Sequence, residues 1–309
     1  MWAVFEPART SVIPNITAGP QILVGNALSS TTWSFNLAVG SALGGLVASL
    51  FGRDTVFVIN SVSFAVSGLL IGRMRFSEGH IANLPPLKAR DLADFSPILE
   101  GVRYVKTDKR LLATMLVKGG LGLMGTNWVL LPIFGEKVFP VPLDGFDPRR
   151  AGMMGMSVLL GCRGVGALLG PLIGNYVAGW SESRLRRGIL AGFLLAPAGY
   201  FCLSVAPNIF AACASVILAH AGGSIVWVFS TTLLQLQTED RFRGRVFSVE
   251  FAFSMLAMST VSSLAGTFYD HGVSVQALAA ATGVIVLLPA AVWAMAQRLW
   301  RQAATKGLA

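Results

Sequence analysis

Charged residues are scarce in this sequence. Only 13% of its 309 residues are Asp, Glu, Lys or Arg, whereas 54% are hydrophobic and the mean hydropathy is +0.65. Soluble globular proteins carry about 25% charged residues, so most of this chain's surface must face something other than water. Several windows exceed the run of about 18 apolar residues that is typical of a membrane-spanning helix. The composition excludes an ordinary soluble domain and predicts an all-α, polytopic membrane helix bundle.

Cysteines and catalytic motifs are equally sparse. The three cysteines, Cys162, Cys202 and Cys213, lie inside apolar runs without CxxC spacing or a nearby His cluster. This arrangement supports neither a disulfide framework nor a metal site. The sequence also lacks a GxxxxGK loop for nucleotide phosphates, an HExxH motif and a GxSxG motif. We therefore expect no cofactor, no metal, no enzyme activity and no ATP-driven step.

Long apolar runs are what the sequence has in abundance, and eight of them are long enough to cross a membrane. We place the spans at Ala27–Leu50, Thr55–Gly72, Leu111–Pro132, Gly152–Gly179, Gly188–Val205, Ile209–Leu234, Val246–Tyr269 and Val273–Gln297. One connection, 73–110, is long and polar, and Ser96 followed by Pro97 begins an expected amphipathic helix within it. That helix is expected either to lie on the membrane surface or to pack on the ends of the spans.

The net charge of +9 comes from basic residues that lie between the apolar runs, so no nucleic-acid partner is expected. Eighteen of the 24 Lys and Arg residues fall in alternate connections and in the terminal segments, against four on the opposite side. Lys118 and Arg163 lie inside spans. Because cytoplasmic loops are enriched in Lys and Arg, this asymmetry predicts a multi-pass protein in the lipid bilayer with both termini in the cytoplasm.

Three stretches together carry a resemblance to a known family. They are FEPARTSVIPN at 5–15, NALSSTTWSFNLAVGSALGG at 26–45 and RFRGRVFSV at 241–249. They resemble the enterobactin-exporter-like and macrolide-efflux-like branch of the major facilitator superfamily. In that branch they match the loop between the fourth and fifth helices, the fifth helix and the loop entering the eleventh. The resemblance implies the twelve-helix fold of two six-helix halves, truncated at its N-terminus, with this chain supplying the last eight spanning helices.

On that resemblance the chain divides into four parts. Residues 1–72 would be the last two helices of the N-terminal half, 73–110 a cytoplasmic linker, 111–297 the C-terminal six-helix half and 298–309 a cytoplasmic tail. The implied function is secondary active export of an amphipathic small molecule, such as a drug or siderophore, across the bacterial inner membrane in exchange for protons, by alternating access. A hypothesis of a different class is a transport-incompetent remnant or a partner-dependent structural membrane protein.

Polar residues inside the spans are the candidates for a cavity or a coupling site, because they are costly in a membrane. Arg163 lies near the middle of its span and is expected to pair with a carbonyl or an acid. His220 is expected either to carry protons or simply to be hydrogen-bonded inside the bundle. Lys118 is expected either to face the interior or to extend towards the membrane surface. The full candidate set is Arg163, His220, Trp227, Asn36 and Lys118.

Two spans carry glycines at spacings that let helix backbones approach closely. One has Gly40, Gly44 and Gly45; the other has Gly166, Gly170, Pro171 and Gly174. Either stripe is expected to serve gating or static packing.

Arginines cluster with acids in the basic loops. Their forked side chains can bind carboxylates bidentately, so they are expected either to form a cytoplasmic latch or to anchor the topology. The latch candidates are Arg184, Arg241, Arg243, Arg245 and Glu250.

Overall fold

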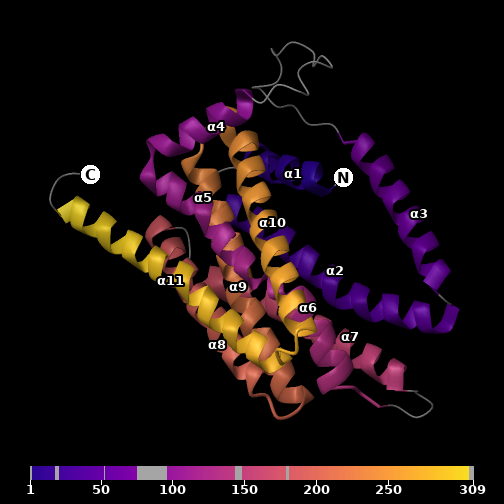
Figure 1. The fold of residues 1–309 in the computed structure, drawn as a ribbon. Helices are drawn as coiled ribbons and strands as arrows, with labels where there is room; N and C mark the ends of the chain where they lie inside the picture. Colours follow the sequence, from indigo (N-terminus) through magenta and orange to yellow (C-terminus); the bar gives the residue numbers. More distant parts are fainter. Residues whose placement is uncertain are drawn as a thin grey trace.

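A computed structural model of the chain describes residues 2–17, 21–51, 53–74, 96–142, 148–178 and 181–305, and nearly all of these residues lie in helices (Figure 1). The expected all-α class is confirmed for this part of the chain. The elements are α1 (Trp2–Ile16), α2 (Gln21–Phe51), α3 (Arg53–Gly72), α4 (Ser96–Thr107), α5 (Lys109–Gly122), η2 (Leu123–Thr126), α6 (Asn127–Ile133), η3 (Phe134–Val138), α7 (Pro148–Ala178), α8 (Glu182–Ser204), α9 (Ile209–Gln237), α10 (Asp240–Asp270) and α11 (Val275–Thr305).

Seven segments among the described residues are long and apolar enough to cross a membrane. They match seven of the eight expected spans. The remaining expected span, Ala27–Leu50, falls within α2, a helix of 31 residues in which many side chains lie outside the described set.

The expected span Leu111–Pro132 is one continuous crossing that changes its helix type along the way. It runs from Lys109 to Val138 as α5, a short 3₁₀ segment η2, α6 and a π-helical turn η3. Pro132 lies inside α6, where it removes a backbone donor. Glycine and proline therefore give this crossing its irregular backbone, which apolar periodicity alone does not predict.

The FEPARTSVIPN stretch differs from the expectation drawn from the resemblance. It was expected to be a loop, but it lies in α1, a helix of 15 residues. Side chains on the helix satisfy one another, as when Arg9 donates to Glu6 Oε1 at 2.6 Å. The loop expected from the resemblance is therefore wrong for this stretch, which is helical throughout.

The amphipathic helix expected from Ser96 is confirmed as α4. It packs across the starts of α5 and α10, with Val105 only 1% exposed in a small apolar cluster that also contains Leu111 and Phe247. Asp108 caps the following helix by accepting from the backbone N–H of Arg110 at 2.7 Å. The expected contact with the ends of the spans is observed, and a position of α4 on the membrane surface stays a prediction.

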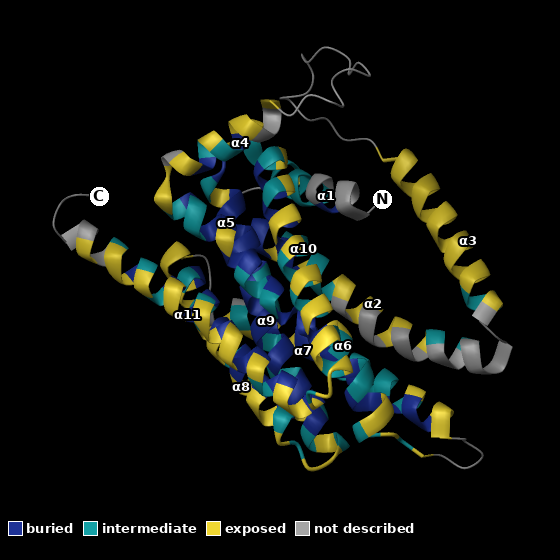
Figure 2. Cartoon of the chain, in the orientation of Figure 1, coloured by how far each residue is buried: buried dark blue, intermediate teal, exposed yellow. Residues whose placement is uncertain are grey.

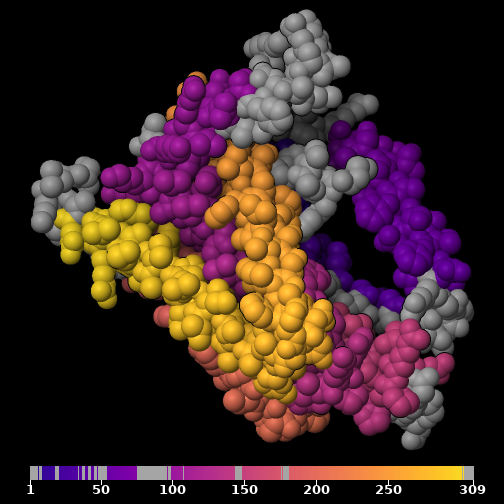
Figure 3. Space-filling view, viewed as in Figure 1, coloured from indigo at the N-terminus to yellow at the C-terminus, as the bar shows by residue number. Residues whose placement is uncertain are grey.

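The core lies between α7, α8, α9 and α11, and α9 is buried along most of its length (Figure 2). The largest enclosed side chains there include Tyr200, Phe193 and Phe229. By contrast, α3 packs mainly on α2 and has no buried residue in its apolar window. In the space-filling view an opening separates α3 from the body of the molecule (Figure 3). The site therefore depends on α1, α2 and the bundle from α5 onwards.

Candidate functional site

A cavity of about 200 Å³ lies where α1, α2, α5, α7, α9 and α10 meet. Its walls are largely apolar and aromatic, with the three indoles of Trp33, Trp128 and Trp227 on them. A few polar and charged side chains project from these walls, among them Arg9, Asn26, Lys118, Arg163, His220 and Ser224. An apolar cavity with a small number of convergent polar groups is the usual form of a small-molecule site.

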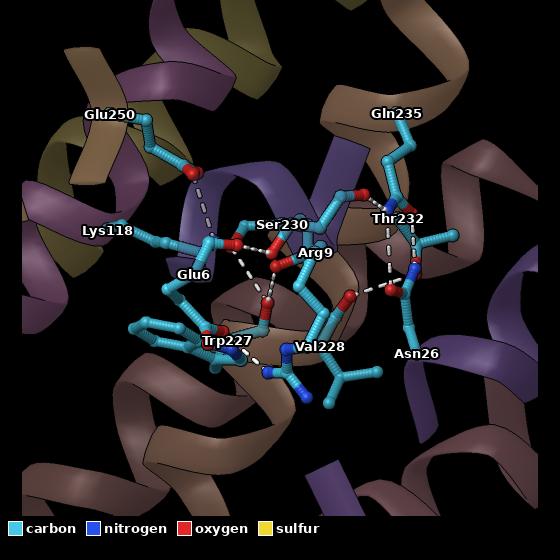
Figure 4. Close-up of polar contacts among 12 residues, drawn as sticks. Glu6, Arg9, Asn26, Lys118, Trp227, Val228, Ser230, Thr232, Gln235 and Glu250 are labelled. Carbon is cyan, nitrogen blue, oxygen red and sulfur yellow. Dashed lines mark hydrogen bonds and ion pairs between the residues drawn. The ribbon is translucent and has the colours of Figure 1, made fainter. Parts of the chain in front are cut away.

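Lys118 and Glu250 form a buried ion pair beside this cavity (Figure 4). The distance from Lys118 Nζ to Glu250 Oε2 is 2.9 Å, and the two side chains are 4% and 1% exposed. The ammonium also lies 4.3 Å from the centre of the Trp227 ring, within cation–π range. The expectation that Lys118 extends to the membrane surface is wrong, because its charge is satisfied inside the bundle.

Glu250 was expected in the arginine latch, and this expectation is also wrong. It is the eleventh residue of α10, so at 1.5 Å per residue its backbone lies about 15 Å along the helix from the arginine-rich start. There it faces Lys118 of α5. Its other oxygen, Oε1, has no hydrogen-bond partner among the described residues. A titratable acid therefore lies deep in the bundle.

Arg163 lies on the cavity wall at the middle of α7, as the sixteenth of its 31 residues. It is 8% exposed. Its guanidinium carbon is 4.1 Å from the centre of the Trp128 ring and 5.7 Å from that of Trp33. No acid in the described part of the chain forms an ion pair with it, and Nη1 is buried without a hydrogen-bond partner there. Among the described residues the guanidinium thus lies beside two aromatic rings, and its pairing with a carbonyl or with an acid of the absent helices stays a prediction.

His220 and Trp227 both line the cavity from α9, as expected. His220 is 8% exposed, and its ring packs edge-on against Tyr200 with centroids 6.5 Å apart. Asn36 behaves differently, since it is exposed and is not among the residues that line the cavity. The face of α2 that reaches the cavity includes Ser29 and Trp33 and ends about one turn before Asn36.

An amide cluster that the sequence reading missed joins α2 to α9 (Figure 4). Asn26 donates to the side-chain oxygen of Gln235 and, at 3.2 Å, to Thr232. Gln235 donates in turn to the backbone oxygen of Thr10 on α1 at 2.9 Å. Asn26 and Gln235 are 5% and 1% exposed. This cluster fixes one wall of the cavity by tying three helices together.

The glycine stripe of α7 lies in close contact with α9. A Cβ at Gly166 or Gly170 would be 2.3 Å from a backbone oxygen of α9, that of Ile217 or Ala221, and a Cβ at Gly174 would be 3.1 Å from the Phe229 ring. Pro171 is buried in the same helix. The α7 stripe therefore packs two helix backbones together, as expected from its spacing.

The stripe of α2 does not pack in this way. A Cβ at Gly40 or Gly44 would meet nothing within 4 Å among the described atoms. Within the described residues Gly40 and Gly44 form no tight helix seam, so a gating or packing role of this stripe stays a prediction, and the surroundings of Gly45 lie outside the described set.

Two of the latch arginines connect separate helices. Arg245 of α10 bridges to Glu100 of α4 at 2.5 Å, and Arg243 donates to Asn15 of α1 at 3.1 Å while also pairing with Asp240. Arg241 pairs only locally, with Glu239 at 3.1 Å. Arg184 is exposed on α8 and forms none of these bridges within the described residues. The arginines thus hold α1 and α4 on the start of α10.

Comparison with known proteins agrees with this architecture. A model of the transmembrane secretion effector family, within the major facilitator superfamily, matches residues 2–307. The chain belongs to this family. The superfamily expected from the three sequence stretches is therefore confirmed. The proteins that the chain matches are transporters, not enzymes.

Individual transporters of the superfamily show the same relationship. YceJ, an MFS-type transporter of Bacillus subtilis, is 26% identical over 93% of this chain and 67% of its own length. Macrolide efflux protein A of Streptococcus pyogenes is 25% identical over 87% of this chain and 63% of its own length. The chain thus spans about two thirds of the length of these relatives. The crystal structure of the Escherichia coli fucose:proton symporter FucP shares the fold, with a TM-score of 0.62 over 94% of this chain and 73% of its own, at 14% identity.

Several residues of the site carried a sequence signal that was available but was read differently. Glu250 lies nine residues beyond Arg241, which places it more than two turns inside α10 and away from the loop. Asn26 opens the NALSST stretch, four residues before Ser30, which approaches Ser224 at 3.4 Å across the cavity. The helices begin earlier than the predicted spans, at Gln21 and Asp240, and this earlier start brings both residues inside the bundle.

Proposed function

We propose that the protein is a secondary active exporter that moves an amphipathic small molecule out of the cell in exchange for protons. The observation that carries the proposal is the cavity lined by three indoles and by charged groups, at the meeting point of α1 and α2 with the bundle from α5 onwards. Family membership and an efflux protein among the relatives support the same direction of transport. Transporters of this architecture bind substrate between their two halves.

The Lys118–Glu250 pair is the proposed coupling site. Within the described residues, the charged groups that border the small pocket next to Glu250 are Lys118 from α5 and Glu6 from α1. A proton on Glu250 would remove the charge that Lys118 neutralises, and the ammonium would then need another partner. Protonation of Glu250 would thereby release Lys118 and favour a different conformation of the cavity. Exchange of protons for substrate requires a link of this kind between proton uptake and the conformation of the binding cavity.

The proposed orientation places the arginine-rich start of α10 and both termini in the cytoplasm, in the inner membrane of a bacterium. The distribution of Lys and Arg supports it. Residues 1–72 then serve as the part of the N-terminal half that faces the C-terminal half, and 73–110 as the linker between the halves.

Efflux of a panel of fluorescent amphipathic compounds from cells expressing the chain tests the proposal. We expect concentrative efflux that stops when a protonophore collapses the proton gradient. Glu250→Gln should abolish proton-driven efflux, because the amide cannot take up a proton. Asp270→Asn is the matched control, since it makes the same change in the same helix at an exposed position. Concentrative efflux that persists after collapse of the gradient, or in Glu250→Gln, would overturn proton coupling.

A partner-dependent structural membrane protein is the second candidate, favoured by α3. Its apolar residues Phe57, Phe64 and Leu69 are 70%, 68% and 67% exposed. Absence of efflux for every compound, with a correctly inserted chain that copurifies with another membrane protein, would favour this candidate over the exporter.

A further inference from the structure

The charges that line the cavity do not balance. Glu6 is paired with Arg9, whose guanidinium lies 2.6 Å from Glu6 Oε1, and Lys118 is paired with Glu250. Arg163 is the remaining cation on the lining, and no carboxylate of the described residues is bonded to it. Since His220 adds no fixed charge when neutral, the cavity carries an excess positive charge at Arg163.

The surroundings of Arg163 satisfy its positive charge in part but not its hydrogen-bond donors. The ring centres of Trp128 and Trp33 lie 4.1 Å and 5.7 Å from the guanidinium carbon, within the range of cation–π attraction. A guanidinium has five N–H donors directed outward in that plane, and aromatic faces do not accept them there. Nη1 is buried without a partner in the described part of the chain. A buried donor on a charged group without an acceptor is costly, so the site is built for an acceptor that comes from elsewhere.

We propose that the cavity binds its substrate through a carboxylate held by Arg163, so that the transported molecules are amphipathic monoanions. This inference rests on the proposed exporter function and deepens it by naming the charge of the cargo. A carboxylate matches the planar fork of arginine and can accept two N–H bonds at once. The apolar body of the same molecule would lie against Trp33, Trp128 and Met258 on the remaining walls.

A single carboxylate fits this site better than a more highly charged anion. The excess charge is that of one arginine, and the other cations of the lining already have carboxylate partners. The mainly apolar walls of the cavity also suit an acid with a hydrophobic body. A neutral analogue of the same shape would leave the donors of Arg163 unsatisfied, and discrimination against such analogues is strong for that reason.

Binding of matched acid and amide probes to the purified full chain in detergent tests the inference. The probes are N-acetyl-L-phenylalanine and its amide, and 4-phenylbutyrate and its amide, titrated against the intrinsic tryptophan fluorescence to which Trp33 and Trp128 contribute. We expect each acid to bind about ten- to hundred-fold more tightly than its amide, the range for a charge-assisted hydrogen bond. Equal binding within both pairs, or no saturable binding of either acid, would overturn the inference.

Variants connect this preference to Arg163. Arg163→Gln should bind acid and amide alike, whereas Arg163→Lys, which keeps the charge without the fork, should keep a reduced preference. Arg187→Gln is the matched control, because Arg187 is exposed on α8 away from the cavity. Persistence of the full preference in Arg163→Gln would overturn the assignment. If Arg163→Gln fails to fold, the comparison of Arg163→Lys with the original chain still decides it.

The same probe pairs in the efflux assay separate this inference from the proposed function. Preferential binding of the acids without their efflux would reject the exporter and leave the carboxylate site standing. Efflux of neutral compounds by a chain that binds acid and amide equally would reject the carboxylate site and leave the exporter standing.

Discussion

The ammonium of Lys118 lies 2.9 Å from a carboxylate oxygen of Glu250, across the contact between α5 and α10. Both side chains are almost fully enclosed by protein, at 4% and 1% exposed. Each charge therefore depends on the other for its stabilisation. Close to the pair, a Cβ at Gly122 would be 2.9 Å from the backbone oxygen of Ser254, so the two helices touch backbone to backbone. The ion pair is held in place by this close contact.

Removing one partner of the pair should therefore destabilise the protein strongly. Lys118→Met leaves the Glu250 carboxylate buried and uncompensated, and we expect a loss of about 3–5 kcal/mol in the free energy of unfolding. The double variant Lys118→Met with Glu250→Leu removes both charges and should recover most of that loss. The measurement is the thermal unfolding midpoint in detergent. A double variant as unstable as the sum of its two single variants would contradict the pairing.

The two glycine stripes should respond differently to the same substitution. Gly170→Ala would place a methyl group 2.3 Å from the backbone oxygen of Ala221, so α7 and α9 must separate. We expect a loss of about 1–3 kcal/mol in the free energy of unfolding, the range for overpacking, and the measurement is a fall of several degrees in the unfolding midpoint. Gly40→Ala is the matched control, because a Cβ at that position meets nothing within 4 Å. Equal effects at the two positions would show that the α7 seam is not tightly packed.

The spans were predictable because a long apolar run indicates a helix buried in lipid, whichever other helices it packs against. The helices α7 to α11 begin and end within a few residues of the predicted spans, apart from the longer polar ends of α8, α10 and α11. The α4 helix was predictable from Ser96, Pro97 and its apolar spacing. The 3₁₀ and π segments between Leu123 and Val138 were not, because they depend on contacts of glycines such as Gly125 with α10.

The site was predictable at the level of single residues but not of their partners. Arg163, Lys118, His220 and Trp227 were recognisable as costly or amphipathic groups inside apolar runs. Their partners depend on which helices are neighbours, information that a helical wheel of one span does not contain. Glu250 was therefore assigned to the nearest arginines in sequence, although its observed partner is 132 residues away. The choice of Asn36 over Asn26 failed for the same reason.

The amide cluster at Asn26 should contribute to both stability and transport. Asn26→Leu removes donors to Gln235 and Thr232 and leaves the Gln235 oxygen buried without them. We expect a loss of about 1–3 kcal/mol, the cost of an unsatisfied buried polar group, together with slower efflux because α2 is no longer held against α9. The exposed Asn60 of α3 offers the control, and Asn60→Leu should change neither quantity. An Asn26→Leu protein with an unchanged unfolding midpoint would remove the cluster from the structural framework.

The bridge between Arg245 and Glu100 should act as a fastener of α4 that responds to charge and salt. Arg245→Glu places two carboxylates together and should lower the free energy of unfolding by about 1 kcal/mol or less, and with it the unfolding midpoint, because the two side chains are 37% and 56% exposed. Adding Glu100→Arg restores opposite charges and should restore the midpoint. The difference between the single and double variants should shrink at 1 M salt, where charges are screened over about 3 Å. The matched control exchanges Arg241 and Glu239, whose side chains pair with each other, while the contact of this segment with α4 is made by the backbone N–H of Glu239 to Tyr104. An equal response to that exchange would show that a general charge effect, rather than the attachment of α4 to α10, is being measured.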